Sequence, residues 1–97
     1  MRVRLTNKVY SDLESAMEYY VREGSNEIAR EFYDEFGRCC QILSQFALSY
    51  PIVRRDVRRI NFHRFPYHIL YQIVDERVVN LLVVKHDRRD PDFGLDR

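Results

Sequence analysis

The amino-acid sequence predicts an α+β fold, a helical hairpin packed on a mostly antiparallel four-stranded sheet in the order β-α-α-β-β-β. Three observations predict this class. The first half of the chain carries two stretches with apolar residues at helical spacing, separated only by Gly24-Ser25. After Pro51 the period changes to the alternation that is typical of strands. Two of the later apolar stretches, residues 67–74 and 78–85, are joined by three polar residues and therefore predict a β-hairpin.

The chain begins with a predicted strand and a predicted helix. Residues 2–6 alternate charged and apolar side chains, which indicates a short strand. Thr6 or Asn7 can cap the helix that follows. The apolar stripe of this helix consists of Val9, Leu13, Ala16, Met17 and Tyr20. We expect Gly24 to end the helix in a left-handed conformation.

Ser25 is a favourable N-cap for a second helix. The apolar stripe of this second helix consists of Ile28, Phe32, Phe36, Cys39, Cys40 and Leu43. The helix is predicted to end near Phe46 or Ala47, because Tyr50 precedes a proline and cannot continue it. A turn as short as Gly24-Ser25 makes the two helices antiparallel neighbours.

Three strands are predicted after the second helix. Residues 55–62 place apolar side chains among arginines, which indicates a strand with a loose register. Residues 67–74 alternate clearly between two faces. Residues 75–77 form a tight polar turn, and residues 78–85 are apolar on both faces, so we expect a central strand there. Asp90-Pro91-Asp92 ends the sheet, and a short tail follows.

Length and composition place the chain among small folded domains. The 97 residues, of which 45% are hydrophobic, predict one domain that spans residues 1–97. No apolar run reaches the roughly 18 residues of a membrane span, and the N-terminus lacks the apolar segment of a signal peptide. The cytoplasm is therefore the expected location. Cys39 and Cys40 point in different directions on one helix and are predicted to be free thiols, one in the core and one near the surface.

The charge distribution is more informative than the net charge of +1. Residues 1–50 carry 6 basic and 8 acidic side chains, whereas residues 51–97 carry 10 basic and 7 acidic ones. In the second half a single acid, Asp56, lies among five arginines: Arg54, Arg55, Arg58, Arg59 and Arg64. One face of the protein can therefore hold an anionic partner while the whole chain stays near neutrality.

The last predicted strand runs directly into Lys85, His86, Arg88 and Arg89. Strand ends of this kind place several hydrogen-bond donors side by side at one rim of a sheet. Such a rim suits phosphate or an acidic protein surface.

The order of elements, together with several short motifs, resembles the ParE/RelE superfamily of bacterial toxins from type II toxin–antitoxin systems. The motifs are Asp12-Leu13-Glu14 with Tyr19-Tyr20, then Ala29, Phe32 and Leu43, then Pro51, then Phe65-Pro66-Tyr67 with Tyr71, and finally His86-Asp87-Arg88-Arg89-Asp90-Pro91. The resemblance covers nearly the whole chain. The details are closer to the ParE-like, plasmid-stabilisation branch than to the ribosome-dependent nucleases.

The resemblance implies a toxin, and it implies one of two activities. ParE-like members inhibit DNA gyrase and are not nucleases, whereas RelE-like members cut messenger RNA on the ribosome without a metal. Both kinds are neutralised by a cognate antitoxin protein. The expected partners are therefore an antitoxin and DNA gyrase, with the ribosome and its messenger RNA as the alternative, and an inactive member that only binds its antitoxin is a third possibility. No cofactor, metal or membrane partner is expected.

Should the chain be a nuclease, its catalytic candidates are His86, Arg64 and Arg88. Metal-free RNA cleavage needs a general base, cations beside the phosphate and a general acid. Histidine titrates near neutrality, and arginine can hold a phosphate with two hydrogen bonds. The alternative is structural: His86 bonds to the backbone or to Asp90, and Arg88 is solvated or paired with a neighbouring carboxylate. The two lysines of the chain and the position of Phe93, which has no hydroxyl, favour the ParE-like activity.

Two further groups of residues are candidates for protein contacts. The predicted target-binding residues are Arg58, Lys85, Arg88 and Arg89. Tyr19, Tyr20 and Tyr33 are predicted to form part of an apolar groove over the helical hairpin, where an antitoxin helix docks. The arginine run has an alternative interpretation as an edge strand that its charges protect from aggregation. The histidines and cysteines show no metal-ligand spacing, so no metal site is predicted.

Overall fold

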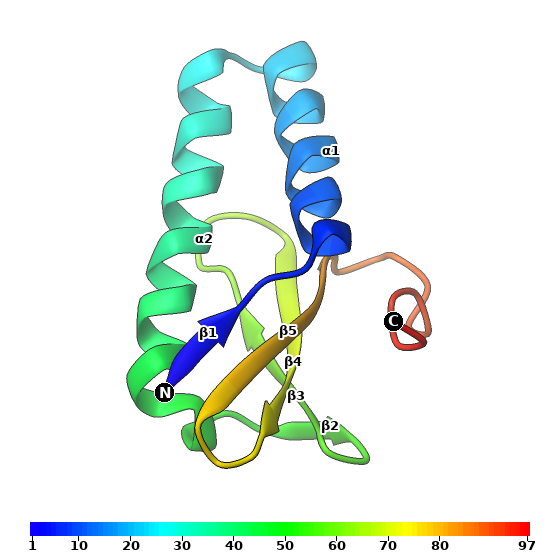
Figure 1. Cartoon of the computed structure of the whole chain (residues 1–97). Coiled ribbons are helices and arrows are strands. Elements are labelled where there is room, and N and C mark those ends of the chain that lie inside the picture. Colours follow the sequence, from blue (N-terminus) through cyan, green and yellow to red (C-terminus); the bar gives the residue numbers. More distant parts are fainter.

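Two antiparallel helices cover one face of a five-stranded sheet in the computed structural model, which describes residues 1–97 (Figure 1). The elements, in chain order, are β1 (Arg2–Arg4), α1 (Asn7–Glu23), α2 (Asn26–Phe46), the 3₁₀ turn η1 (Ala47–Ser49), β2 (Ile52–Arg54), β3 (Val57–Asn61), β4 (Tyr67–Val74) and β5 (Val78–His86). The tail after β5 runs back beside the beginning of α1 (Figure 1). No helix is long and apolar enough to cross a membrane.

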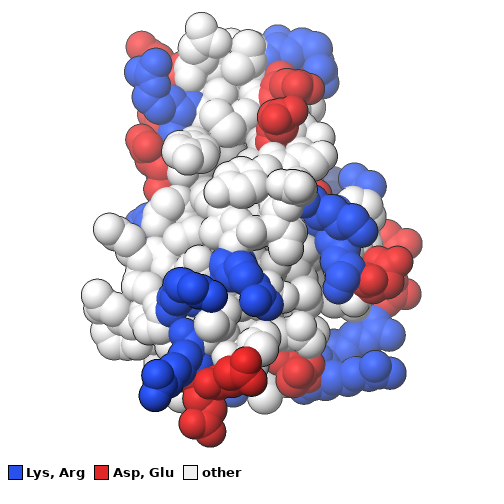
Figure 2. Space-filling view, viewed as in Figure 1, with Lys and Arg blue, Asp and Glu red and all other residues white.

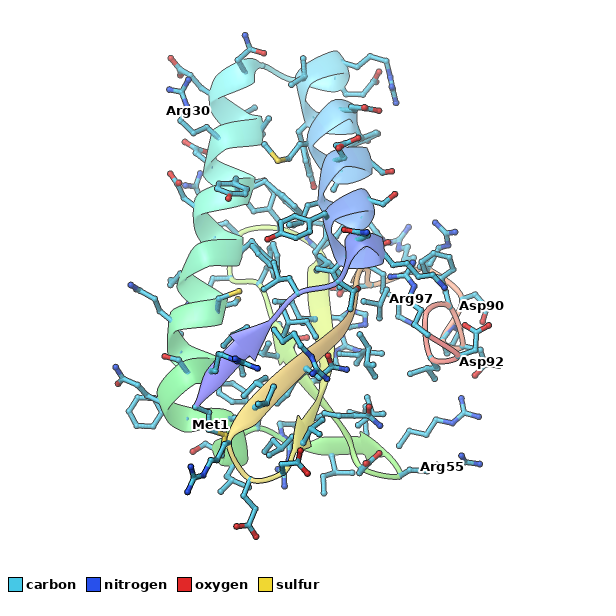
Figure 3. All side chains as sticks on the ribbon, in the orientation of Figure 1. Met1, Arg30, Arg55, Asp90, Asp92 and Arg97 are labelled. Atoms are coloured by element: carbon cyan, nitrogen blue, oxygen red, sulfur yellow. The ribbon has the colours of Figure 1, made fainter.

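The sheet has the strand order β1-β5-β4-β3-β2, and only the β1–β5 pair is parallel. The mostly antiparallel sheet and the central position of β5 are therefore confirmed, but the prediction of four strands is wrong. Arg55 adopts a left-handed conformation (φ 53°), which turns the chain so that Ile52–Arg54 forms an additional short strand beside β3. The strand predicted at residues 55–62 consequently begins at Val57. Arg55 projects from this turn (Figure 3).

Both helices begin at the caps that the sequence predicts. The Thr6 Oγ1 accepts the N–H of Val9 at 3.3 Å, and the Ser25 Oγ accepts the N–H of Ile28 at 3.1 Å. The left-handed conformation predicted for Gly24 is wrong, because its φ is −137°. A Cβ at this position would instead lie 3.0 Å from both the Tyr20 carbonyl oxygen and the Cδ1 of Ile28, so the turn has little room for a side chain.

The main core fills the space between the helices and the sheet. Phe32 of α2 and Ile69 and Tyr71 of β4 are fully buried in it, and burying a side chain of this size contributes about 1.5–3 kcal/mol. The Tyr71 hydroxyl donates to the Ala47 carbonyl at 2.7 Å, which ties β4 to the end of α2. Cys39 is buried and Cys40 half-buried, and both are free thiols as predicted.

A β-bulge in β5 decides which way the end of the strand faces. Leu70 pairs with Val83 but Tyr71 pairs with Leu81, so Leu82 is the extra residue. Leu82 and Val83 consequently both lie in the smaller cluster on the outer face of the sheet. Side chains beyond the bulge have the opposite phase, which turns His86 toward the helices and Lys85 toward the outer face.

Candidate functional site

Lys85 fastens the tail to the outer face of the sheet. Its side chain is 4% exposed, and its Nζ donates to the carbonyl oxygens of Asp90 (3.1 Å), Pro91 (2.9 Å) and Phe93 (3.1 Å). Three acceptors use all three donors of an ammonium group. Burial lowers the pKa of Lys85. The sequence-based expectation that Lys85 stands at an open cationic rim is therefore wrong, because the bulge turns it under the tail.

A buried ion pair holds the end of the tail. The guanidinium of Arg97 donates to both carboxylate oxygens of Asp12, at 2.6 and 3.0 Å, and Asp12 also accepts the N–H of Val84 at 3.1 Å. Arg97 donates in addition to the Leu82 carbonyl at 3.2 Å. Because β1 pairs with β5 only up to Asn80, these side chains bond the part of the β5 edge that no strand covers.

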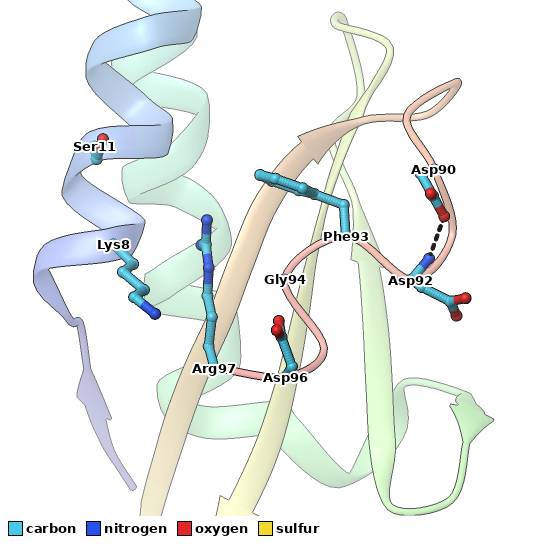
Figure 4. A pocket seen from close by; sticks show the side chains of 8 residues that line it. All are labelled: Lys8, Ser11, Asp90, Asp92, Phe93, Gly94, Asp96 and Arg97. Carbon is cyan, nitrogen blue, oxygen red and sulfur yellow. Dashed lines mark hydrogen bonds between the residues drawn. The ribbon is translucent and has the colours of Figure 1, made fainter.

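The tail packs tightly between these two anchors. The ring of Phe93 contacts two guanidinium groups: its centroid lies 3.9 Å from that of Arg89 and 5.1 Å from that of Arg97. Gly94 has a φ of +86°, and a Cβ there would lie 2.6 Å from the Cβ of Val83. Figure 4 shows Phe93 and Arg97 extending from the tail toward α1, where Lys8 and Ser11 line the same pocket of about 660 Å³.

His86 lies on the helix side of β5. Its Nδ1 accepts the N–H of Arg88 at 3.0 Å, and its ring meets the edge of Tyr67 at a centroid distance of 5.2 Å. This backbone hydrogen bond corresponds to the structural alternative that the sequence analysis considered for His86. Arg88 is exposed and makes no ion pair, and the guanidinium of Arg89 also makes no ion pair but lies over the ring of Phe93.

Arg64, the third catalytic candidate, belongs to a different part of the molecule. It forms an ion pair with Glu31 of α2 at 3.3 Å. The backbone of its loop is held by the carboxylate of Glu35, which accepts the N–H groups of His63 (2.9 Å) and Arg64 (3.2 Å). Burial opposes ionisation of Glu35, but the hydrogen bonds from Arg38 and from these N–H groups outweigh it and lower the pKa. No hydrogen bond or ion pair joins Arg64 to His86.

A histidine that the sequence does not single out occupies the outer face. His68 is buried, and its Nδ1 lies 2.8 Å from a carboxylate oxygen of Asp87, which Arg59 also contacts at 3.4 Å. Burial lowers the pKa of His68 against the opposing effect of Asp87. His68 pairs with Lys85 across β4 and β5, and this pairing could have indicated that the two side chains share the outer face. It could not be derived from the sequence, because the register of the two strands depends on the bulge.

The remaining candidates divide between structural and exposed positions. Arg58, a predicted target-binding residue, donates to the carbonyls of Leu48 (3.2 Å) and Tyr50 (2.7 Å) and so holds the connection from α2 to β2. Tyr20 packs in the aromatic part of the core, 5.1 Å from Phe65, which removes it from the predicted groove. Tyr19 and Tyr33 are exposed.

No group of three or more histidine, cysteine or acidic side chains lies close enough together to hold a metal ion.

The candidate site consists of two parts that differ in their chemistry. One is the tail with its cationic anchors, and the other is the exposed surface of the helical hairpin.

Comparison with known proteins identifies the family of this chain. A family model described as "ParE toxin of type II toxin-antitoxin system, parDE" matches residues 3–91. Among curated proteins, none matches the sequence.

Several solved structures share the fold, among them the following three. The chromosomal ParDE toxin–antitoxin system from P. aeruginosa matches with a TM-score of 0.78 and 21% identity, over 89% of this chain and 95% of that chain. The RelBE2 complex from Mycobacterium tuberculosis (TM-score 0.51, 23% identity) covers 88% of this chain and 95% of its own. The isolated E. coli RelE toxin (TM-score 0.55, 14% identity) covers 98% of this chain and 93% of its own. With a family match over nearly its whole length, the chain belongs to the ParE toxin family of type II toxin–antitoxin systems.

Proposed function

We propose that this toxin acts in the cytoplasm by inhibiting DNA gyrase and that a cognate antitoxin protein neutralises it. The observation that carries the proposal is the match to the ParE toxin family over residues 3–91. The placement of the catalytic candidates supports a toxin that is not a nuclease. His86 faces the helices, whereas Arg64 is paired with Glu31 in a separate loop. A metal-free cleavage of RNA needs its base and its cations around one phosphate.

The helical hairpin supports the antitoxin part of the proposal. Tyr10 and Val21 recur on one stripe of α1, and Tyr33 occupies a flank of α2; these three apolar side chains are all exposed. Figure 2 shows an uncharged band between flanking charged side chains over the two helices. An amphipathic segment of a partner binds to such a surface by burying its own apolar face there. Tyr19 shares its flank of α1 with Asp12 and Ser15, so we place it outside this surface.

The test is controlled expression followed by pulse labelling of DNA synthesis and protein synthesis. A gyrase inhibitor should stop DNA synthesis early while translation continues, and co-expression of the antitoxin should restore growth. Early loss of translation would exclude gyrase as the primary target. Unaffected growth, with folded protein present, would show that the chain only binds its antitoxin.

A second candidate function, metal-independent cleavage of messenger RNA on the ribosome, has one observation in its favour. The exposed Arg88 has no carboxylate partner and lies two residues from His86. If this activity were the correct one, His86→Ala and Arg88→Gln should each abolish toxicity while the protein remains folded. For the gyrase inhibitor, we expect His86→Ala to retain toxicity.

A further inference from the structure

A hollow of about 350 Å³ lies between one flank of α1 and the end of β5, beside the tail. Its volume falls in the range of about 300–1,000 Å³ that is typical of small-molecule sites. Part of its lining also holds the tail or packs against the core, but several polar side chains that face it have no partner within the protein. The chemistry of its lining therefore indicates what it can bind.

The hollow is lined by four hydroxyl groups without protein partners. They belong to Ser11, Ser15 and Tyr19 of α1 and to Tyr67 of β4, and none makes a hydrogen bond within the protein. Burial raises the pKa of Tyr67, so its phenol stays protonated and can donate at neutral pH.

His86 contributes a further donor in a fixed orientation. Its Nδ1 accepts the N–H of Arg88 at 3.0 Å, so the proton of the neutral imidazole lies on Nε2. The ring of Tyr67, packed against it at 5.2 Å, limits rotation of the imidazole. The Nε2–H group is therefore available to a ligand.

Arg89 supplies positive charge to the same hollow. Its guanidinium lies 3.9 Å over the ring of Phe93 and makes no ion pair. A guanidinium that is stacked on an aromatic ring keeps its N–H edges free and loses little rotamer freedom on binding. The only acidic residue in the lining, Asp12, is occupied by Arg97 and by the N–H of Val84. The hollow thus presents several hydrogen-bond donors and one unpaired cation. It contains no unpaired carboxylate that would repel an anion.

We propose that this hollow binds the phosphate group of a small molecule. Donors from α1, β4, β5 and the tail surround it on several sides, which suits a tetrahedral oxyanion better than a flat carboxylate. The proposal depends neither on gyrase nor on the antitoxin. Its failure would leave the proposed function intact, and failure of the proposed function would leave this site intact.

The test is a titration of the full chain with inorganic phosphate at constant ionic strength, followed by two-dimensional ¹H–¹⁵N NMR. We expect saturable shifts at Val84, His86 and Arg88. Arg89→Gln should weaken binding roughly tenfold or more, because a charge-assisted hydrogen bond is lost. Ser15→Asp, on the surface of α1, should abolish binding by placing a carboxylate in the hollow, and it tests the site without disturbing the tail.

Arg77→Gln is the matched control. It removes the same charge from the turn at the opposite end of β5, and it should leave phosphate affinity unchanged. A parallel titration with a nucleoside 5′-monophosphate distinguishes an organic phosphate, if it binds more tightly, from the free ion. Absence of saturable shifts, equal weakening by Arg77→Gln and Arg89→Gln, or the same shifts with acetate would each overturn the proposal.

Discussion

The C-terminal tail and the helical hairpin use their conspicuous side chains in different ways. In the tail, Lys85 and Arg97 direct their charges inward, to backbone carbonyls and to Asp12. On the hairpin, Tyr10 and Tyr33 are about half exposed, at 54% and 51%, and their hydroxyl groups have no hydrogen bond within the protein. Lys85 and Arg97 are therefore structural, whereas Arg88 and Arg89 of the tail and the exposed aromatic residues of the helices remain free for a partner.

The largest effect should follow from breaking the anchor of the tail. Asp12→Ala leaves the guanidinium of Arg97 and the N–H of Val84 without their partner in a largely buried place. Removing one member of a buried pair typically costs about 3–5 kcal/mol. Chemical denaturation should show a loss of this size in the free energy of unfolding.

The exposed pair between Arg54 and Asp92 is the control for this comparison. Arg54→Ala should change the free energy of unfolding by no more than about 1 kcal/mol. Equal effects of the two substitutions would mean that the Asp12–Arg97 pair does not anchor the tail.

A smaller loss of unfolding free energy is expected when a substitution disturbs the packing of the tail. Gly94→Ala would force a left-handed conformation on an alanine and press its Cβ against Val83, which should cost about 1–3 kcal/mol. Gly37→Ala, on the exposed side of α2 with open space around it, should stabilise the protein by about 0.5–1 kcal/mol. Thermal unfolding of the two variants should therefore shift in opposite directions, and a tail that tolerates Gly94→Ala would be loosely attached.

The outer face beneath the tail should make stability depend on pH. Burial lowers the pKa of His68 below its ordinary value of 6.5. The unfolded chain then binds a proton at pH values where the folded chain does not, so stability is full above about 6.5 and falls as the pH is lowered toward the folded pKa. The difference in unfolding free energy between the wild type and His68→Gln should shrink between pH 7.5 and 5.5. A difference that is constant over this interval would contradict a neutral, buried His68.

The smallest effect on stability should come from the hairpin surface. Tyr33→Ser should alter the free energy of unfolding by about 0.5 kcal/mol or less, because the side chain is exposed. It should nevertheless weaken binding of the antitoxin in isothermal titration calorimetry. Tyr19→Ser, on the other flank of α1, should leave that affinity unchanged. The reverse pattern would move the antitoxin surface to the tail side of the hairpin.

The helices, their caps and the central strand could be predicted from the sequence because each has a strong local signal. Ser25 and Thr6 cap where expected, and the apolar stripes fix the buried faces. The bulge at Leu82 could not be predicted, since a strand that is apolar on both faces gives no sign of a change in phase. For the same reason the opposite orientations of Lys85 and His86 stayed hidden.

Side-chain contacts between residues that are distant in the sequence could not be predicted either. Asp12 and Arg97 lie at opposite ends of the chain and show no spacing that links them. The left-handed turn at Arg55 is unusual for a residue other than glycine, so no local pattern indicated that this stretch divides into two strands.

We propose that this ParE-family toxin inhibits gyrase as a folded protein whose tail is locked to the sheet. The most direct test of this proposal is the supercoiling of relaxed plasmid by purified DNA gyrase, with the purified chain added and with the cognate antitoxin added in a second series. We predict dose-dependent loss of supercoiling that the antitoxin reverses and that His86→Ala preserves. Undiminished supercoiling, together with arrest of a cell-free translation reaction by the same protein, would contradict the account and identify the ribosome as the target.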